Sequence, residues 1–278
     1  MGSLLITILS NGISDFIIQT NDIAQGRKSE DLKERKKSNK KHFVQTFLTM
    51  LILLIPLFID KNNIIYSSIN LLIYVFIISI IHILIDVSKC KLEIHNSLRN
   101  RKMKSILFLL DQMFHIITII AIHNIFAKTI KYNFLLYNLL PKLDRKIYYY
   151  ILIIIIVLLY VVRGGVFFVN IIMEEIIPKY ISQGSDSTKD ETNNIYNSVS
   201  AYIGMLERFI TVMFSINNQY SALALLITAK SIARGEEIKK DPNFGADFLV
   251  GTFLSIGLGI IGGEVIKFIA KYVLYIAN

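Results

Sequence analysis

Two apolar stretches of the sequence each place a histidine and an aspartate four residues apart. IISIIHILIDVSK carries His82 and Asp86, and MKSILFLLDQMFHIITIIAIHNIFA carries Asp111 and His115. Residues four apart lie on one face of a helix, one above the other. A carboxylate inside a run of hydrocarbon length costs several kcal/mol, about 2.5–3.5 on insertion scales, so it needs a partner or a task. Imidazole and carboxylate together are ligands that suit divalent metals.

The two stretches are expected to pair as an antiparallel hairpin, because only the basic loop Cys90–Met103 separates them. In such a hairpin, residues equidistant from the turn share one depth. His82 should therefore face His115, and Asp86 should face Asp111. We predict that these four side chains bind one divalent cation, with Zn, Mn, Fe and Mg as candidates because no thiolate takes part.

A hydrolytic reaction at this metal is the chemistry we predict. Asp86 and Asp111 would act beside the metal-activated water, and Lys89 would hold a phosphate or another anion. Four further polar residues are expected to support the site from the first, second and fourth apolar stretches: Asp15, Gln19, His42 and Gln112. The alternative interpretation is that these polar side chains only satisfy one another.

The composition describes an integral membrane protein. The 278 residues are 53% hydrophobic, with a mean hydropathy of +0.52, which is far from a soluble domain. The net charge is +9, and segments 27–41 and 89–104 hold 14 of the 30 Lys and Arg. We interpret them as cytoplasmic loops facing anionic lipid headgroups, and expect no nucleic-acid partner. Cys90 is the only cysteine, which excludes a disulfide framework.

We predict an all-α, polytopic transmembrane bundle of six to eight membrane helices in a bacterial inner membrane. Segment 202–234 is too long for one upright span, so it is either a bent pair of helices or one helix that projects from the bilayer. The expected parts are an N-terminal membrane module (1–146), a connecting transmembrane helix (147–181), a polar, disordered linker (182–198) and a C-terminal membrane module (199–278).

Small residues recur every four positions in the last apolar stretch, at Gly251, Ser255, Gly259 and Gly263. Such a ladder lets another helix approach closely. Its partner is either a helix of the same chain or a second copy in a homo-oligomer.

The chain resembles the bacterial multi-span membrane family known as domain of unknown function 3307. The similar stretches are SDFIIQ (14–19), HILIDVSK (82–89), LDQMFH (110–115), GMLERFI (204–210), ALLITAKSIAR (224–234) and ADFLVGTFLSIGLG (246–259). Members usually carry a histidine four residues before the aspartate that matches Asp15. Here Asn11 stands there, which weakens a metal role for the first helix. The resemblance implies a kind of protein and no settled activity; the His/Asp pattern is also loosely similar to membrane-bound metal-dependent hydrolases.

Three functions fit these observations. The first is a divalent-metal-dependent membrane hydrolase acting on a lipid or isoprenoid phosphate at the cytoplasmic interface. The second is a proton- or cation-coupled transporter that uses the same carboxylates as a relay. The third is a non-catalytic oligomeric effector or scaffold whose subunits meet along the small-residue ladder.

Overall fold

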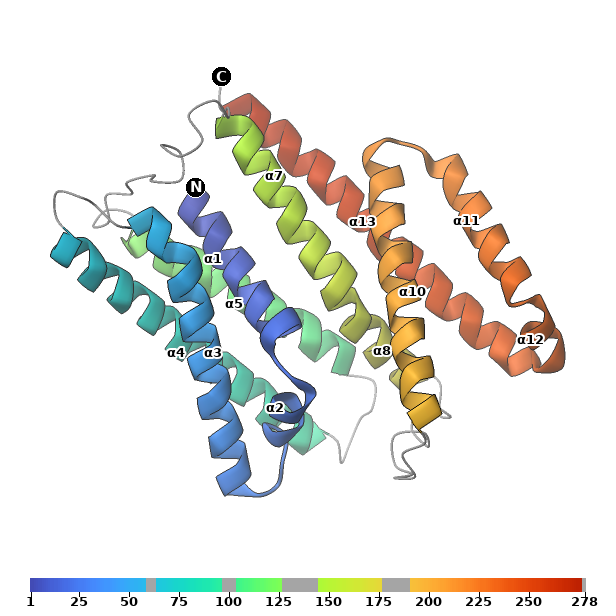
Figure 1. Cartoon of the computed structure of the whole chain (residues 1–278), viewed down its shortest axis with the longest axis horizontal. Helices are drawn as coiled ribbons and strands as arrows, with labels where there is room; N and C mark the ends of the chain where they lie inside the picture. Colours follow the sequence, from blue (N-terminus) through green and yellow to red (C-terminus); the bar gives the residue numbers. More distant parts are fainter. Residues whose placement is uncertain (59–63, 97–103, 127–144, 177–190, 277–278) are drawn as a thin grey trace. The chain divides into compact units, whose positions relative to one another are not determined.

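The computed structural model describes residues 1–58, 64–96, 104–126, 145–176 and 191–276, and within these ranges every regular element is a helix (Figure 1). The chain divides into two compact units, Met1–Ile156 and Val157–Asn278. The division falls inside α7 (Arg145–Leu158), whereas the sequence interpretation placed it at 182–198. Residues 191–198 of that stretch belong to the helix α10, and 182–190 lie outside the described residues.

The first unit is built around a ring of four helices. They are α1 (Gly2–Ile13), α3 (Leu32–Phe58), α4 (Ile64–Asn96) and α5 (Lys104–Phe126). Helix α1 packs on α3, α3 on α4, α4 on α5, and α5 again on α1. One end of the ring is filled by an apolar core, which is made of Ile6, Met50, Leu54, Leu71, Tyr74, Val75, Ile78, Ile119, Ile122 and Leu152. The polar cluster described below occupies the other end.

A π-helical turn, Ser14–Ile18, continues α1 and ends where Gln19 becomes extended. The backbone N–H of Gln19 donates to the carbonyl of Ser14, five residues earlier, at 3.0 Å. The wider turn changes which side chains face the bundle, and such turns are frequent at functional sites. The short helix α2 (Asn21–Gly26) follows and packs on α3.

The two basic segments are largely helical, which corrects their assignment as loops. Helix α3 begins at Leu32, and the Asp31 carboxylate accepts the backbone N–H of Lys33 at 3.0 Å, as an N-cap residue does. Helix α4 continues to Asn96, so half of the expected loop Cys90–Met103 is helix, and 97–103 lie outside the described residues. Helices α3 and α4 therefore continue beyond their apolar parts into the basic segments.

Four helices of the described residues are long and apolar enough to cross a membrane: Ile65–Glu93, Lys104–Phe126, Lys146–Ile176 and Asn243–Tyr272. The expected six to eight spans are not supported. Helix Gly2–Ile18 is too short, the apolar part of α3 begins only after Lys41, and segment 202–234 is divided by a turn. The chain is an all-helical, membrane-associated protein.

The second unit is centred on the pairing of α10 (Glu191–Ile216) with α13 (Pro242–Ile276). A second π-helical turn, Leu159–Gly164, and α8 (Gly165–Ile176) pack against both helices. Asn218, with φ of 56°, turns the chain from α10 into α11 (Tyr220–Ala233), and asparagine tolerates this left-handed backbone better than most residues. Of the two alternatives left open for 202–234, the structure shows the bent pair of helices. Helix α12 (Gly235–Lys240) leads into α13.

The small-residue ladder of α13 lies against α10 of the same chain. A Cβ on Gly259 would lie 2.6 Å from Cβ of Thr211, and one on Gly263 would overlap Ser215. Ser255 Oγ accepts a hydrogen bond from Arg208 at 3.1 Å. Gly251 faces Met173 of α8 instead. The face that a homo-oligomer would use at Gly259 and Gly263 is thus already covered.

Candidate metal centre

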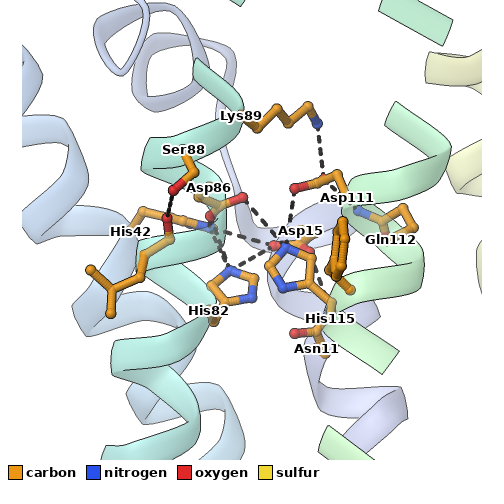
Figure 2. Close-up of polar contacts among 12 residues, drawn as sticks. Asn11, Asp15, His42, His82, Asp86, Ser88, Lys89, Asp111, Gln112 and His115 are labelled. Atoms are coloured by element: carbon orange, nitrogen blue, oxygen red, sulfur yellow. Dashed lines mark hydrogen bonds and ion pairs between the residues drawn. The ribbon is translucent and has the colours of Figure 1, made fainter. Parts of the chain in front are cut away.

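Histidine and aspartate side chains from three elements of the first unit meet between α3 and α4 (Figure 2). Asp15 comes from the π-helical turn and His42 from α3, while His82 and Asp86 come from α4. His42 is 0% exposed, His82 2% and Asp86 5%. The side chains that the sequence assigned to support, Asp15 and His42, therefore lie at the centre of the cluster.

The donor atoms of these four residues lie close together, and the two imidazole nitrogens contact both carboxylates. His42 Nε2 lies 3.0 Å from His82 Nε2, and each of these nitrogens lies 3.2 Å from Asp86 Oδ2. Asp15 Oδ1 is 3.4 Å from His42 Nε2 and 3.3 Å from His82 Nε2. Three of these residues, His42, His82 and Asp86, form a group whose ligand atoms are close enough together to hold one metal ion.

Hydrogen bonding alone accounts poorly for these contacts. A neutral imidazole has one N–H, yet Nε2 of His42 faces His82, Asp15 and Asp86 within 3.4 Å. Charge-assisted hydrogen bonds are usually 2.7–2.9 Å long. The Nδ1 atoms of His42 and His82 have no hydrogen-bond partner among the described residues, whereas metal-ligating imidazoles usually bond through both nitrogens. The convergence of Nε2 atoms is nevertheless the pattern of a cation site.

Arg27 is a member of the site that the sequence interpretation missed. Its Nη2 lies 2.7 Å from Asp86 Oδ2, and both side chains are 7% exposed. Burial alone would lower the pKa of Arg27, but the charge of Asp86 outweighs it and raises that pKa, so the guanidinium stays cationic. Its neighbour Lys28 pairs with Glu93 at 2.7 Å on the exposed side. Arg27 follows Gly26, where an added Cβ would overlap the side chain of Ser38 of α3. The sequence alone carries no signal that Arg27 belongs to the cluster.

On the α5 side of the cluster, His115 and Asp111 lie beside the same aspartate of α4. The rings of His82 and His115 stack with centroids 4.3 Å apart, as expected from the hairpin. Nε2 of His115 is 3.5 Å from both Asp86 Oδ1 and Asp111 Oδ1. Lys89 was expected to hold an anion, but its Nζ donates to Asp111 Oδ2 at 2.9 Å. The four side chains of the predicted seam therefore do lie together, with Lys89 neutralising Asp111.

The remaining supporting residues differ in their positions. Gln112 Nε2 donates to Asp111 Oδ2 at 3.1 Å, and Asn11 Nδ2 donates to Asp15 Oδ2 at 3.3 Å. Among the described residues, the side chain of Gln19 makes no hydrogen bond to the cluster; only its backbone takes part, by closing the π-helical turn. Asn11 and Gln112 are thus placed to orient carboxylates.

A layer of apolar side chains lies next to the cluster, with the buried hydroxyl groups of Ser14, Thr46 and Ser79 among them. Ile78, one turn before His82 on α4, is 2% exposed, and Ile119, one turn after His115 on α5, is 1% exposed. Met50 of α3 is fully buried in the same core. A small second polar group lies beyond this layer, where Tyr74 OH contacts Thr7 Oγ1 at 3.1 Å and His123 Nδ1 at 3.3 Å. The layer separates the two groups.

In the second unit, the charged residues form their own pairs. Glu207 accepts two hydrogen bonds from Lys230, at 2.8 and 2.9 Å. Arg208, 2% exposed, donates to the carbonyl of Val162 in the π-helical turn and to Ser255. Lys230 is therefore the ion-pair partner of the buried Glu207.

The fold and the cluster together define a membrane-associated helical protein with a buried His/Asp centre. Residues 4–141 match the family described as protein of unknown function (DUF3307). The chain belongs to this family, and every residue of the cluster lies within the matched half. The similar stretches noted between 204 and 259 lie outside it. No curated protein and no solved structure matches the chain.

Proposed function

We propose that this protein is a divalent-metal-dependent membrane enzyme that hydrolyses a lipid or isoprenoid phosphate at the membrane interface. The observation that carries the proposal is the set of donor atoms of His42, His82, Asp15 and Asp86, of which five measured separations lie between 3.0 and 3.4 Å. Oxygen and imidazole donors in this number suit zinc, and they also accept manganese or iron.

The depth of the cluster supports chemistry at an interface. In the span Ile65–Glu93, a hydrocarbon core of about 30 Å takes up about 20 residues. Counted from Ile65, that core ends near Ile85, so Asp86 lies at its edge. The exposed pair Lys28–Glu93 and the basic first half of α3 continue from the same end. A phosphate headgroup would reach this level while its chain stays in the lipid, and basic side chains there favour anionic lipids.

The chemistry follows from the cation and its surroundings. A divalent metal lowers the pKa of a bound water to about 7, which supplies hydroxide at neutral pH. The hydroxide oxygen would attack phosphorus, the ester P–O bond would break, and the leaving oxygen would take a proton from water. Arg27 holds Asp86 and Lys89 holds Asp111, so both cations also favour an incoming anion.

The transporter alternative has less support. Transporters place their substrate site near the bilayer midplane, and an ion path needs polar groups across the whole bundle. Here Asp86 lies at the edge of the hydrocarbon core, as counted above, and beside the cluster Ile78, Ile119 and Met50 are buried. The hydroxyl groups of Ser14, Thr46 and Ser79, also buried there, are the feature that still fits an ion path. The scaffold alternative relied on the small-residue ladder, whose Gly259 and Gly263 contact α10 of the same chain. A bacterial inner membrane as the location and additional short spans by α1 and α3 remain part of the proposal.

Metal analysis of the purified full-length chain in lipid nanodiscs tests the proposal. Wild-type protein incubated with Mn²⁺ or Zn²⁺ and passed through a desalting column should retain metal, and His42→Gln or His82→Gln should lose it. His123→Gln is the matched control, because it removes another buried histidine of the same unit outside the cluster. Release of inorganic phosphate from a lipid phosphate should follow metal content. Retention that is equal in the His42→Gln, His82→Gln and control proteins would refute the metal site.

A further inference from the structure

Asp86 presents its two carboxylate oxygens to two different groups of donors. Oδ2 lies 3.2 Å from the Nε2 atoms of both His42 and His82, within the first set of donors. Oδ1 lies 3.5 Å from Nε2 of His115 on the opposite helix, α5. A carboxylate that faces two donor sets in this way is the usual bridge between two metal ions.

The second set consists of Asp86 Oδ1, Asp111 Oδ1 and His115 Nε2. One ligand atom from each of these three residues lies within 4.8 Å of the others. Asp111 is 4% exposed and His115 1% exposed, yet Asp111 Oδ1 and His115 Nε2 have no hydrogen-bond partner among the described residues. Unpaired polar atoms this deeply buried are costly, and both lie on the side of their side chain that faces Asp86.

Neighbouring side chains orient Asp111 and His115 without occupying the space between the three donor atoms. Lys89 and Gln112 both donate to Asp111 Oδ2, at 2.9 and 3.1 Å, which leaves Oδ1 free. The stacked ring of His82 holds the plane of His115. Groups that fix a ligating carboxylate through its second oxygen are typical of metal sites.

We propose that a second divalent cation binds Asp86 Oδ1, Asp111 Oδ1 and His115 Nε2, so that Asp86 bridges a two-metal centre. This inference rests on the proposed function and deepens it. Paired metals about 3.5–4 Å apart hold both the attacking and the leaving oxygen of a phosphoryl group. The second set has only three protein ligands, so it keeps positions open for that group.

The charges of the cluster indicate which phosphate it would take. Asp15, Asp86 and Asp111 carry three negative charges, and Arg27 and Lys89 carry two positive charges, so with neutral imidazoles the cluster holds one net negative charge. Two divalent cations change this to three positive charges. One hydroxide and one dianionic phosphate then restore neutrality. This charge balance therefore favours a phosphate monoester over a diester, with an alcohol and inorganic phosphate as products.

Mn²⁺ titration of the full-length chain in nanodiscs tests this proposal, with bound metal measured after equilibrium dialysis and by electron paramagnetic resonance. We expect about two Mn²⁺ per chain and a spin-coupled signal for the wild type. Asp111→Asn and His115→Gln should each retain about one Mn²⁺ with an uncoupled signal. Ser88→Ala, on the same turn of α4 but bonded only to its own helix backbone, should behave as the wild type.

The outcomes separate the two proposals. One Mn²⁺ in the wild type that Asp111→Asn and His115→Gln both retain would overturn the second site and leave the first intact. No Mn²⁺ in the wild type would overturn both. Thermal unfolding of each variant checks that it is folded. Asp111→Asn and His115→Gln address the same site, so if one of them misfolds, the other still tests the proposal.

Discussion

Replacing Arg27 by methionine should destabilise the metal-free protein far more than the metal-loaded protein. Arg27 and Asp86 form a 2.7 Å ion pair in which each side chain is only 7% exposed. Removing one partner of such a pair leaves a buried, uncompensated charge, at a cost of about 3–5 kcal/mol. A divalent cation beside Asp86 would compensate the charge, so the loss in the loaded protein should be that of one hydrogen bond, about 1–2 kcal/mol.

The melting temperature measures this difference directly. For a unit of this size, Met1–Ile156, each kcal/mol corresponds to about 2–4 °C. Arg27→Met should therefore lower Tm by about 6–20 °C in chelator and by about 2–8 °C in saturating Mn²⁺. Tryptophan is absent from the chain, so far-ultraviolet circular dichroism in detergent is the suitable readout.

The adjacent residue supplies the matched control. Lys28 also forms a 2.7 Å ion pair, with Glu93, but its side chain is 57% exposed, and exposed pairs contribute about 0–1 kcal/mol. Lys28→Met should leave Tm nearly unchanged with and without metal. If Arg27→Met lowers Tm equally in chelator and in Mn²⁺, no cation lies beside Asp86, and the reasoning about the centre is wrong.

Three further predictions concern packing, charge and ligand. Gly259→Leu should destabilise the second unit by about 1–3 kcal/mol through overlap with Thr211, whereas Gly257→Leu, with no atom within 4 Å, should not; chemical denaturation followed by circular dichroism compares them. Lys230→Met should cost about 3–5 kcal/mol by leaving the buried Glu207 unpaired, and the additional change Glu207→Gln should restore most of the loss in Tm. Removing metal with a chelator should lower the stability of the wild type by about 2.7 kcal/mol relative to protein at one hundred times the metal Kd, again read as Tm.

The sequence predicted that residues of α4 and α5 form a polar cluster, but it did not predict which residues lie at the centre of that cluster. Spacing of four on two adjacent helices placed His82 opposite His115, because a short connection between antiparallel neighbours restricts their relative register. Family membership was also predicted and is confirmed by the match over 4–141. The prominent role of His42 and Asp15 was not predicted, because it depends on how α1 and α3 pack on α4, and periodicity within one helix carries no information on that packing.

Arg27 and the number of spans were missed for related reasons. Arg27 was treated as one charge in a basic segment, although its partner Asp86 is 59 positions away and only the fold brings them together. The span count assumed that each apolar stretch forms an independent helix of sufficient length. The break at Asn217–Gln219 divides one of them, and the extended backbone at Gln19 ends the first after Ile18.

Asn11 keeps Asp15 in place at the position where the family resemblance implies a histidine. Its amide donates to Asp15 Oδ2 at 3.3 Å, which leaves Oδ1 for His42 and His82, at 3.4 and 3.3 Å. A histidine there would compete as a ligand, whereas an amide cannot supply an imidazole lone pair and instead fixes the carboxylate. Asn11 is fully buried, so this contact is shielded from water. Asn11 therefore orients Asp15, whose Oδ1 contacts His42 and His82.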